Sequence, residues 1–464
     1  MKFGGTSVED TPAFTNVARI VAKHEGLRPV VVVSAMSGVT NALLRSVGDA
    51  SVGNVEAAKS SLAQHYERYV DVARTLLSGE LAKASISTIE QIRETTAALL
   101  YSIGSQPSSR PRLQDSVVTI GEQLSAMLLT AILRERELSA REVDGRRCIV
   151  TEDRCGCAAP FQGETFRRTR EQLHPLIASA VVPVLGGFMG STPLGETTTL
   201  GRGGSDYSAS LIGAALMSNE IQIWTDVSGV LTANPRVVPS ARTIPRLSYD
   251  EAAELAYFGA KVLHPKSIQP AVESNIPVRI YNSRLPNAPG TLICAASETS
   301  QQTVKAIAHK TGVTTLQINS ARMLGAYGFL RAIFEVFDRH RTAVDVVTTS
   351  EVSVSLSLDD AIALPSIVEE LEPLGTVNVE KRRAIICVVG EGLRSTPGIA
   401  ARIFNTISDI NVSLISQGAS RINITFAIDE RHVDEAVRRL HQEFFEEPSL
   451  QTTTATALAV CAEA

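Results

Sequence analysis

Four short runs of consecutive apolar residues recur through the first 292 residues of the chain. Strands that are apolar on both sides are typical of a parallel sheet covered by helices on both faces. Residues 54–100 carry apolar positions at helical spacing, with acidic and basic residues on the opposite side. Residues 1–292 are therefore predicted to form a doubly wound, mainly parallel α/β domain. The four runs are PVVVVSA (29–35), SAVVPVLGGF (179–188), IQIWTDV (221–227) and PVRIYN (277–282).

A second pattern, strand–helix–strand–strand–helix–strand, occurs twice after the polar stretch 292–303. Two copies of one pattern indicate two similar modules. The first copy occupies 314–381 and the second 383–446, and each is predicted to be a ferredoxin-like βαββαβ module. The second copy ends after its second helix, so 304–310 is predicted to supply its missing strand, which inserts the first module into the second. A linker strand that packs elsewhere is the alternative. The Thr/Ala-rich tail 447–464 is expected to be weakly ordered at most.

Composition excludes several classes of protein. The 464 residues exceed one ordinary core and predict two to four domains. A formal net charge of −5 argues against nucleic acid as a partner. No secretory signal is expected, and the apolar stretch 176–190 is interrupted by Pro183, Gly186 and Gly187, so no membrane span is predicted. The six cysteines contain no C-x-x-C pair, and we expect free thiols in a reducing cytoplasm.

Two glycine-rich segments predict a phosphate site. Residues 2–7 read KFGGTS, and residues 197–206 read TTTLGRGGSD. Glycines allow backbone N–H groups to approach an anion, hydroxyls add donors, and Lys2 supplies a positive charge. Neither segment is a Walker A loop, and neither is the dinucleotide-binding G-x-G-x-x-G, because Asp206 stands where the last glycine belongs. Either segment alone is more often a glycine-rich surface loop, but the combination is specific.

These segments resemble the aspartate kinases of the amino acid kinase family, and the resemblance runs from residue 2 to about residue 446. It implies the amino acid kinase fold followed by two ACT modules. It also implies transfer of the γ-phosphate of ATP to the side-chain carboxylate of L-aspartate, giving 4-phospho-L-aspartate, the first step of lysine, threonine and methionine biosynthesis. The matching segments are KFGGTS (2–7), SAMSGVTN (34–41), GE (121–122), GGFMGS (186–191), TTTLGRGGSD (197–206), WTDVSGVLTANPR (224–236) and FGAKVLHP (258–265).

The resemblance assigns catalytic roles to Lys2, Asp206 and Lys261. A carboxylate with an unperturbed pKa of about 3.9 is already ionised at neutral pH, so the reaction needs no general base. It needs positive charge where two anions meet. Lys2 is expected to contact the transferring phosphoryl group, and Lys261 is expected to reach the nucleotide phosphates. Asp206 is expected to orient Lys2 or the substrate amine. Without the family match, Lys261 reads more simply as a solvated surface charge.

The family's pattern also implies a site for aspartate made of Thr40, Glu122, Arg202 and Ser205. A guanidinium can pair bidentately with a carboxylate, so Arg202 is expected to bind the α-carboxylate of aspartate. Glu122 is the expected partner of the ammonium group. An acidic residue at a helix N-terminus, stabilised by the helix dipole, is the competing interpretation of Glu122.

The nucleotide is expected to lie along the WTDVSGVLTANPR segment, with Mg²⁺ bound to ATP. Thr225 and Asp226 are expected near the adenosine or ribose, and Arg236 near the phosphates. Two residues depart from the family's pattern: Leu231 replaces a common Tyr, and Asn234 replaces a common Asp. Lys2 also lies in a strand that relatives begin several residues earlier, so a shortened first strand or a misassigned start is expected. The expected ATP-binding residues are Lys2, Gly4, Gly5, Thr6, Ser7, Thr225, Asp226, Leu231, Arg236 and Lys261.

The first ACT module resembles the effector site of lysine-sensitive aspartate kinases. Backbone N–H groups at the start of the 328–340 helix can accept an effector carboxylate, and Asp345 can pair with an ammonium group. The alternative is that Phe329 and Leu330 are core residues and Asp345 is a charge at the start of a strand. L-Lysine is the expected allosteric inhibitor. The expected effector-binding residues are Met323, Gly328, Phe329, Leu330, Asp345, Thr349, Ser350 and Glu351.

Further expectations concern assembly and location. ACT modules commonly pair across a twofold axis, so a homodimer or a dimer of dimers is expected in the cytoplasm, with no membrane or nucleic acid as partner. Two other functions remain open: a kinase for another acidic amino acid such as glutamate, and a catalytically silent amino-acid sensor. A piece of a longer bifunctional polypeptide is a third possibility, although no dehydrogenase or decarboxylase pattern follows residue 446.

Overall fold

A computed structural model describes residues 1–259, 263–295, 303–359 and 362–446, and these divide into two compact units. Unit 1 comprises Met1–Leu231 and Thr243–Gln301, and unit 2 comprises Thr232–Arg242 and Gln302–Ala464. The chain therefore leaves unit 1 for eleven residues within the range 1–292 that was expected to be catalytic. Each unit has its own hydrophobic core.

Unit 1 is built on an eight-stranded sheet of order β3-β4-β2-β1-β7-β9-β10-β8. All neighbours pair in parallel except β9 and β10. Strands β2, β4, β7 and β9 correspond to the four apolar runs, and the predicted mainly parallel α/β fold is confirmed. The bounds are β1 Lys2–Phe3, β2 Val31–Val33, β3 Ala140–Val143, β4 Val182–Gly186, β7 Ile221–Thr225, β8 Arg246–Ser248, β9 Val278–Asn282 and β10 Thr291–Cys294.

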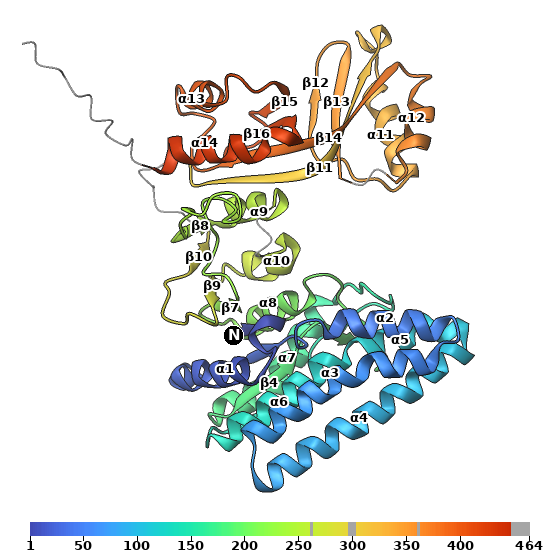
Figure 1. Cartoon of the computed structure of the whole chain (residues 1–464), viewed down its shortest axis with the longest axis vertical. Helices are drawn as coiled ribbons and strands as arrows, with labels where there is room; N and C mark the ends of the chain where they lie inside the picture. Colours follow the sequence, from blue (N-terminus) through green and yellow to red (C-terminus); the bar gives the residue numbers. More distant parts are fainter. Residues whose placement is uncertain (260–262, 296–302, 360–361, 447–464) are drawn as a thin grey trace, which may run out of the picture. The chain divides into compact units, whose positions relative to one another are not determined.

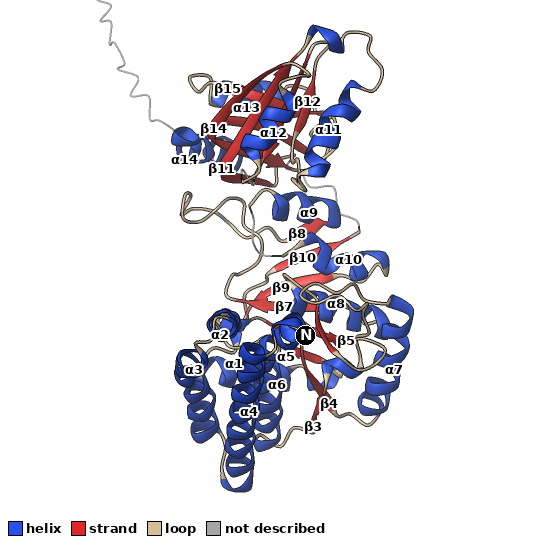
Figure 2. Ribbon diagram, turned by 90° about the vertical axis from the view of Figure 1, so that its right-hand side faces the viewer, coloured by secondary structure: helices blue, strands red, loops and turns tan. Residues whose placement is uncertain are grey.

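Helices cover both faces of this sheet (Figure 2). Helices α1 to α6 share one large core with β1, β2 and β4, while α7 and α8 pack on the other side of the same strands. The small hairpin of β5 (Met189–Ser191) and β6 (Thr197–Thr199) precedes α8. The helices are α1 Thr11–Lys23, α2 Val39–Ser51, α3 Val55–Leu76, α4 Gly79–Ser105, α5 Arg110–Val118, α6 Ile120–Glu135, α7 Gln162–Ala178, α8 Gly204–Leu216, α9 Tyr249–Tyr257 and α10 Pro265–Glu273.

One helical stretch, Arg110–Glu135, is long and apolar enough to cross a membrane by length and composition. However, 83% of its apolar window is buried inside the protein. Leu124, Leu128 and Leu129 of α6 belong to the core of unit 1. Because core helices pass the same test, the stretch is weak evidence for a membrane span. The apolar stretch 176–190 contains the end of α7 and strand β4.

Unit 2 contains a six-stranded antiparallel sheet of order β12-β13-β11-β14-β16-β15, with four helices packed on it (Figure 1). Two apolar cores lie along this sheet. One is formed with α11 and α12, and the other with α13 and α14. The bounds are β11 Ala306–Asn319, β12 Val347–Thr349, β13 Ser353–Leu358, β14 Thr376–Val389, β15 Val412–Gln417, β16 Asn423–Asp429, α11 Phe329–Arg339, α12 Leu364–Leu371, α13 Ile399–Thr406 and α14 Val433–Phe445.

The two long strands β11 and β14 run through both halves of the sheet. The sequence predicted separate strands at 304–310 and 314–321, but β11 is continuous and carries register irregularities between Lys310 and Val313 and between Val313 and Thr315. Its first part pairs with 385–389, and its second part pairs with 376–380 and with β13. A bulge preserves backbone pairing while it adjusts the strand, so the turn-like residues near Gly312 do not break it.

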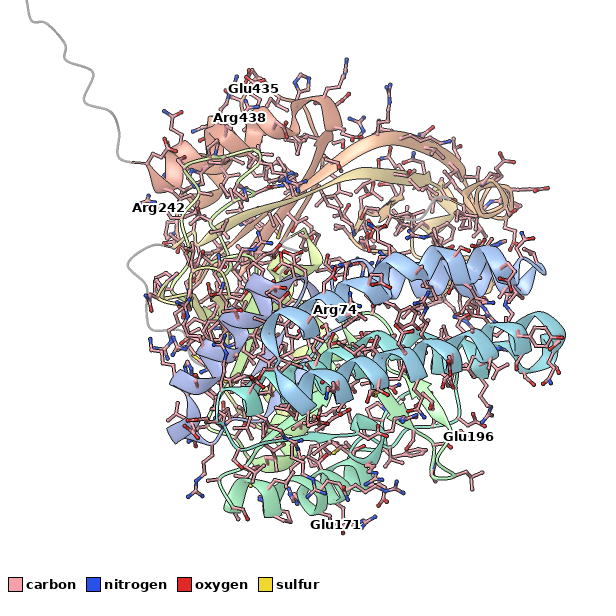
Figure 3. The ribbon with its side chains drawn as sticks, turned by 60° about the horizontal axis from the view of Figure 1, so that its bottom comes forward. Arg74, Glu171, Glu196, Arg242, Glu435 and Arg438 are labelled. Atoms are coloured by element: carbon pink, nitrogen blue, oxygen red, sulfur yellow. The ribbon has the colours of Figure 1, made fainter. Side chains whose placement is uncertain are left out.

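The segment Thr232–Arg242 is built into the core of α13 and α14. Ala233 and Val238 are buried in that core, and the N–H of Ile307 donates to the carbonyl of Thr232 at 2.8 Å. The hydroxyl of Thr232 lies 2.9 Å from Nε2 of the buried His441. Figure 3 shows Arg242, the last residue of this segment, on the loop next to α14. A segment that follows a strand of unit 1 thus belongs structurally to unit 2.

Candidate active site

Lys2 lies in the middle of the unit 1 sheet, because β1 is flanked by β2 and β7. Only 8% of the residue is exposed. A buried ammonium needs a partner, and Lys2 Nζ lies 2.7 Å from Asp206 Oδ1. Asp206 stands in the first turn of α8. The two glycine-rich segments, 2–7 and 197–206, are therefore in direct contact.

The residues after Lys2 form a tight turn. The N–H of Gly4 donates to the carbonyl of Trp224 at 3.0 Å, and residues Gly5–Ser7 form a 3-10 helix. A Cβ on Gly5 would approach the carbonyl oxygen of Ala35 to 2.9 Å, so only glycine fits without a shift. The Ser7 hydroxyl donates to Ser283 Oγ at 2.8 Å. Ser7 thus connects this turn to the end of β9.

The three threonines of TTTLGRGGSD are buried in β6, and each hydroxyl has a different protein partner. Thr197 accepts from Arg146, Thr198 pairs with Thr151, and the third, Thr199, donates to a buried carboxylate on α5. Threonine suits these positions because its hydroxyl can bond to neighbours while its methyl group packs in a strand. The strand that leads into the glycine-rich turn is therefore fixed through its side chains.

The turn itself requires glycine at two positions. Gly201 and Gly203 have φ values of +74° and +73°, in the left-handed region that residues with a Cβ avoid. Gly203 is the N-cap of α8, so Ser205 and Asp206 lie in the first turn of this helix. The free N–H groups and the helix dipole make this end of a helix suitable for an anion. Arg202, between the two glycines, is exposed.

The GGFMGS segment packs against the start of α8. A Cβ on Gly187 would lie 2.8 Å from Cα of Ser205, and a Cβ on Gly204 would lie 2.7 Å from the ring of Phe188. The N–H of Phe188 donates to Ser208 Oγ at 3.0 Å. These close approaches fix the position of Ser205 and Asp206 relative to the end of β4.

Glu122 is the most strongly perturbed acid of the site. It lies in the first turn of α6, is 3% exposed, and Oε2 has no hydrogen-bond partner among the described residues. Burial raises the pKa of Glu122 to about 8, although the backbone of Ala35 and the charge of Lys2 act in the opposite direction. Gly121 packs so closely on Ala35 that a Cβ would approach its Cβ to 2.5 Å. The SAMSGVTN and GE segments therefore meet here, and Thr40 of the first is half-buried at the start of α2.

The expected nucleotide residues are divided between the two units. Thr225 ends β7, and its hydroxyl donates to Asp226 Oδ1 at 3.2 Å. Leu231 is bridged to Thr243 at the point where the chain leaves unit 1. Arg236 is exposed in the segment that belongs to unit 2, whereas Thr225 and Asp226 belong to unit 1. Lys261 lies outside the described residues.

Sequence reasoning missed two residues at the end of β9. The Asn282 amide donates to the carbonyl of Asp226 at 3.3 Å and to Ser228 Oγ at 3.1 Å. The Ser283 hydroxyl accepts a hydrogen bond from the Ser7 hydroxyl and donates one to the carbonyl of Thr225. Both residues hold the turn that follows β7. The signal was the polar end of the PVRIYN run, which was interpreted as a strand only.

The expected effector residues lie in unit 2. Gly328, with φ +79°, precedes α11, and Phe329 and Met323 are half-buried against the core of α11 and α12. Leu330 is exposed. Asp345 precedes β12, and its side chain forms an ion pair with Lys310 at 3.6 Å. Three more expected residues, Thr349, Ser350 and Glu351, are exposed at the turn between β12 and β13.

Comparisons with known proteins agree with this architecture. Residues 1–282 match the amino acid kinase family, and residues 386–444 match the ACT domain. The lysine-sensitive aspartokinase 3 of Escherichia coli is 37% identical, over 96% of this chain and 98% of the relative. The chain belongs to the aspartokinases of the amino acid kinase family. Aspartokinase III of E. coli in complex with aspartate and ADP superposes with a TM-score of 0.82 at 36% identity, covering 96% of this chain and 99% of that one. The complex of the same E. coli protein with lysine and aspartate gives a TM-score of 0.79 at 37% identity, with the same coverage.

Proposed function

We propose that this member of the aspartokinase family transfers the γ-phosphate of ATP to the side-chain carboxylate of L-aspartate. The observation that carries the proposal is the buried ion pair between Lys2 and Asp206 at the first turn of α8. A buried lysine next to free N–H groups of a helix provides positive potential for a phosphoryl group. The related E. coli enzyme has been solved with aspartate and ADP, which are a substrate and a product of this reaction.

The arrangement fits a reaction that needs charge neutralisation. The acceptor carboxylate of aspartate is ionised at neutral pH and attacks the γ-phosphorus without a general base. Lys2 stabilises the charge on the transferring phosphoryl group, and Asp206 holds Lys2 in position. Catalysis of this kind is mainly positioning and electrostatic stabilisation.

Aspartate is proposed to bind between α2, α6 and the glycine-rich turn. Its ammonium group pairs with Glu122, whose unsatisfied Oε2 lies in a buried position. A positive charge placed there favours the ionised form of Glu122 and lowers its pKa from about 8. Arg202 binds the α-carboxylate, and Thr40 and Ser205 complete the substrate site.

ATP is proposed to bind along the turn after Lys2 and the turn after β7. Gly4, Gly5, Thr6 and Ser7 provide the first of these turns, and Thr225 and Asp226 the second. Leu231, Arg236 and Lys261 remain proposed contacts from the family pattern. Mg²⁺ commonly binds through nucleotide phosphates and one or two carboxylates, where it neutralises phosphate charge. Within the described ranges no group of three or more His, Cys, Asp or Glu side chains could hold a metal ion.

Lysine is proposed as the allosteric inhibitor. The E. coli relative is named lysine-sensitive and has been solved with lysine bound. In this chain the effector carboxylate would meet the N–H groups at the start of α11, and its ammonium group would meet Asp345. Inhibition requires that lysine binds two states of the enzyme with different affinity. The proposed modules are 314–381 for the effector-binding ACT domain and 304–310 with 383–446 for the second. A homodimer or a dimer of dimers in the cytoplasm remains a prediction.

Acyl phosphate formation, trapped as the hydroxamate, tests the proposal. Assays contain ATP and Mg²⁺ with aspartate or glutamate, and lysine, threonine and methionine are added separately. We expect product with aspartate only and suppression by lysine only. Product with glutamate instead would indicate a different acidic substrate. Lysine binding without any product would indicate a silent sensor and would overturn the proposal.

A further inference from the structure

Asp115 connects two loops behind the glycine-rich turn. It lies on α5, and the residue is 1% exposed. Its carboxylate accepts the N–H of Gly156 at 3.0 to 3.1 Å and the hydroxyl of Thr199 at 3.1 Å. Thr199 ends β6, and its carbonyl in turn accepts the N–H of Ala158 at 2.8 Å. One buried carboxylate thus joins the 153–158 loop to the strand that leads into TTTLGRGGSD.

The 153–158 loop lies directly against Gly201. A Cβ on Gly201 would approach Cβ of Cys157 to 3.1 Å and the carbonyl oxygen of Gly156 to 3.4 Å. Gly201 is the residue before Arg202. The loop therefore supports the backbone from which the guanidinium of Arg202 extends. Because Arg202 is exposed and no ion pair is found for it among the described residues, its backbone is the main element that sets its position.

A second residue of α5 acts on the same two segments. Arg112, one helical turn before Asp115, forms ion pairs with Asp153 at the start of the loop and with Glu196 just before β6. Figure 3 shows Glu196 at the end of the hairpin that precedes α8. Arg112 is 40% exposed, whereas Asp115 is buried. Solvent therefore screens the ion pairs of Arg112 much more than it weakens the hydrogen bonds of Asp115.

We infer that Asp115 is a positioning residue for aspartate binding, which acts through Thr199 and the 153–158 loop on Arg202. This inference rests on the proposed role of Arg202 as the α-carboxylate ligand. Losing the bond to Asp115 weakens the connection between β6 and the loop, which then rests on the N–H of Ala158 at the carbonyl of Thr199 and on the exposed ion pairs of Arg112. The guanidinium then samples several positions, and aspartate binds more weakly. The nucleotide turns at Gly4–Ser7 and Thr225 do not depend on these contacts.

Thr199→Val is the sharpest variant, because valine keeps the shape of threonine and removes the hydroxyl. We expect the KM for aspartate to rise about tenfold, since the lost hydrogen bond loosens the support of Arg202 and small misplacements reduce productive binding strongly. The KM for ATP should change less than about twofold, since the nucleotide turns are untouched. Thr199→Ser restores the hydroxyl and should return the KM for aspartate close to that of the wild type.

Two further variants separate positioning from stability. Asp115→Asn should raise the KM for aspartate as Thr199→Val does, whereas Arg112→Met should raise it much less. Thr96→Val is the matched control. Thr96 lies in α4, which carries no site residue, and is 1% exposed; its hydroxyl lies 2.6 Å from the hydroxyl of Tyr66 in α3. It should lower the melting temperature without changing either KM.

The outcomes can be told apart. The inference would be overturned if Thr199→Val and Asp115→Asn both keep the wild-type KM for aspartate and only lower the melting temperature. That result would show a purely structural role. If Asp115→Asn does not fold, the comparison of Thr199→Val with Thr199→Ser decides. A wild-type protein that forms no acyl phosphate would overturn the proposed function and this inference with it. An active wild type with an unaffected Thr199→Val would overturn this inference alone.

Discussion

Lys2 Nζ and Asp206 Oδ1 lie 2.7 Å apart, and both side chains are largely shielded from water, at 10% and 15% exposed. This pair joins the first strand of the chain to the first turn of α8. Charge at such a site acts in a low dielectric, where its effect on a developing negative charge is strong.

Replacement of Lys2 by methionine should therefore lower kcat by about 10² to 10³-fold, the effect typical of a lost electrostatic contact to a transition state. Methionine is unbranched like lysine and only one atom shorter, so the fold should persist. The measurement is the initial rate of hydroxamate formation at saturating aspartate and ATP. A rate within a few-fold of the wild type would remove Lys2 from the chemistry.

Asp206→Asn should have a smaller effect, because the charge on Lys2 remains and only its position is released. We expect a reduction of kcat of about tenfold, since losing the position of a catalytic group costs part of the gain from orientation. The double variant Lys2→Met with Asp206→Asn should be no slower than Lys2→Met alone, because residues that act as a unit are not additive. Additive effects in this cycle would show that Asp206 has a separate role.

Glu122→Gln should separate stability from function. Burial raises the pKa of Glu122 to about 8, so between pH 4.5 and 8 the folded protein binds a proton that the unfolded chain has lost. The stability of the wild type therefore falls as pH rises through this window. Glutamine cannot ionise, so the variant should have a higher melting temperature than the wild type at pH 8, with a smaller difference at pH 5.

The same variant should bind aspartate poorly, because the ammonium group loses its anionic partner. In the wild type, aspartate binding ionises Glu122 and releases a proton, so the KM for aspartate should fall as pH rises from 6.5 to 8. Glu122→Gln should lose this pH dependence. Isothermal titration in two buffers of different ionisation enthalpy measures the released proton directly, and no proton release at pH 7 would contradict the assignment.

The parallel sheet was predictable because its strands are apolar on both sides, and the ACT modules because their pattern repeats. The contacts of Lys2 with Asp206 and of Glu122 with Ala35 follow from long-range packing, which spacing along a chain does not encode. Family resemblance supplied those residues, whereas local sequence gave no sign of Asp115. A single buried carboxylate on a helix looks like any other acidic residue until its partners, Gly156 and Thr199, are in view.

The packing of the segment 232–242 could not be predicted from local sequence either. Its first five residues, 232–236, end the WTDVSGVLTANPR segment that is expected to lie along the nucleotide, and Ala233 and Val238 are buried in a core of unit 2. Short apolar residues in a loop give no indication of which core they join. The predicted boundary between catalytic and regulatory parts was drawn from composition, which changes only near residue 292.

Thr232→Val should destabilise unit 2, because it leaves Nε2 of the buried His441 without the hydroxyl at 2.9 Å. An unsatisfied buried polar atom costs about 1–3 kcal/mol. Hydrogen exchange of α14, which carries His441, should speed up accordingly. Thr232→Ser retains the hydroxyl and serves as the control. Equal exchange rates in the valine and serine variants would show that the hydrogen bond contributes little.

Acid should weaken unit 2 through two histidines. Burial lowers the pKa of both His441 and His309. At His441, Glu446 acts in the opposite direction and Arg242 adds to the lowering. At His309, Asp434 acts in the opposite direction. Below about pH 6.5 the unfolded chain binds protons that the folded unit does not, so stability falls as pH decreases. Urea midpoints measured at pH 7.5 and 5.5 should show a loss that is smaller in His441→Gln. An unchanged loss in that variant would exclude His441 as a source.

Lys310 occupies one side of Asp345, the proposed partner of the effector ammonium group. Lys310 Nζ lies 3.6 Å from Asp345 Oδ2 and also pairs with Asp359. An effector ammonium must compete with this internal one for the same carboxylate, since opposite charges within about 4 Å interact strongly where solvent is limited. Asp345 is 5% exposed, so the competition is not screened by water.

Lys310→Met should therefore lower the lysine concentration for half-inhibition several-fold, with uninhibited activity unchanged. Asp345→Asn should raise that concentration strongly, measured in the same hydroxamate assay. Lower sensitivity in Lys310→Met would show that Lys310 supports the effector site instead of competing for it.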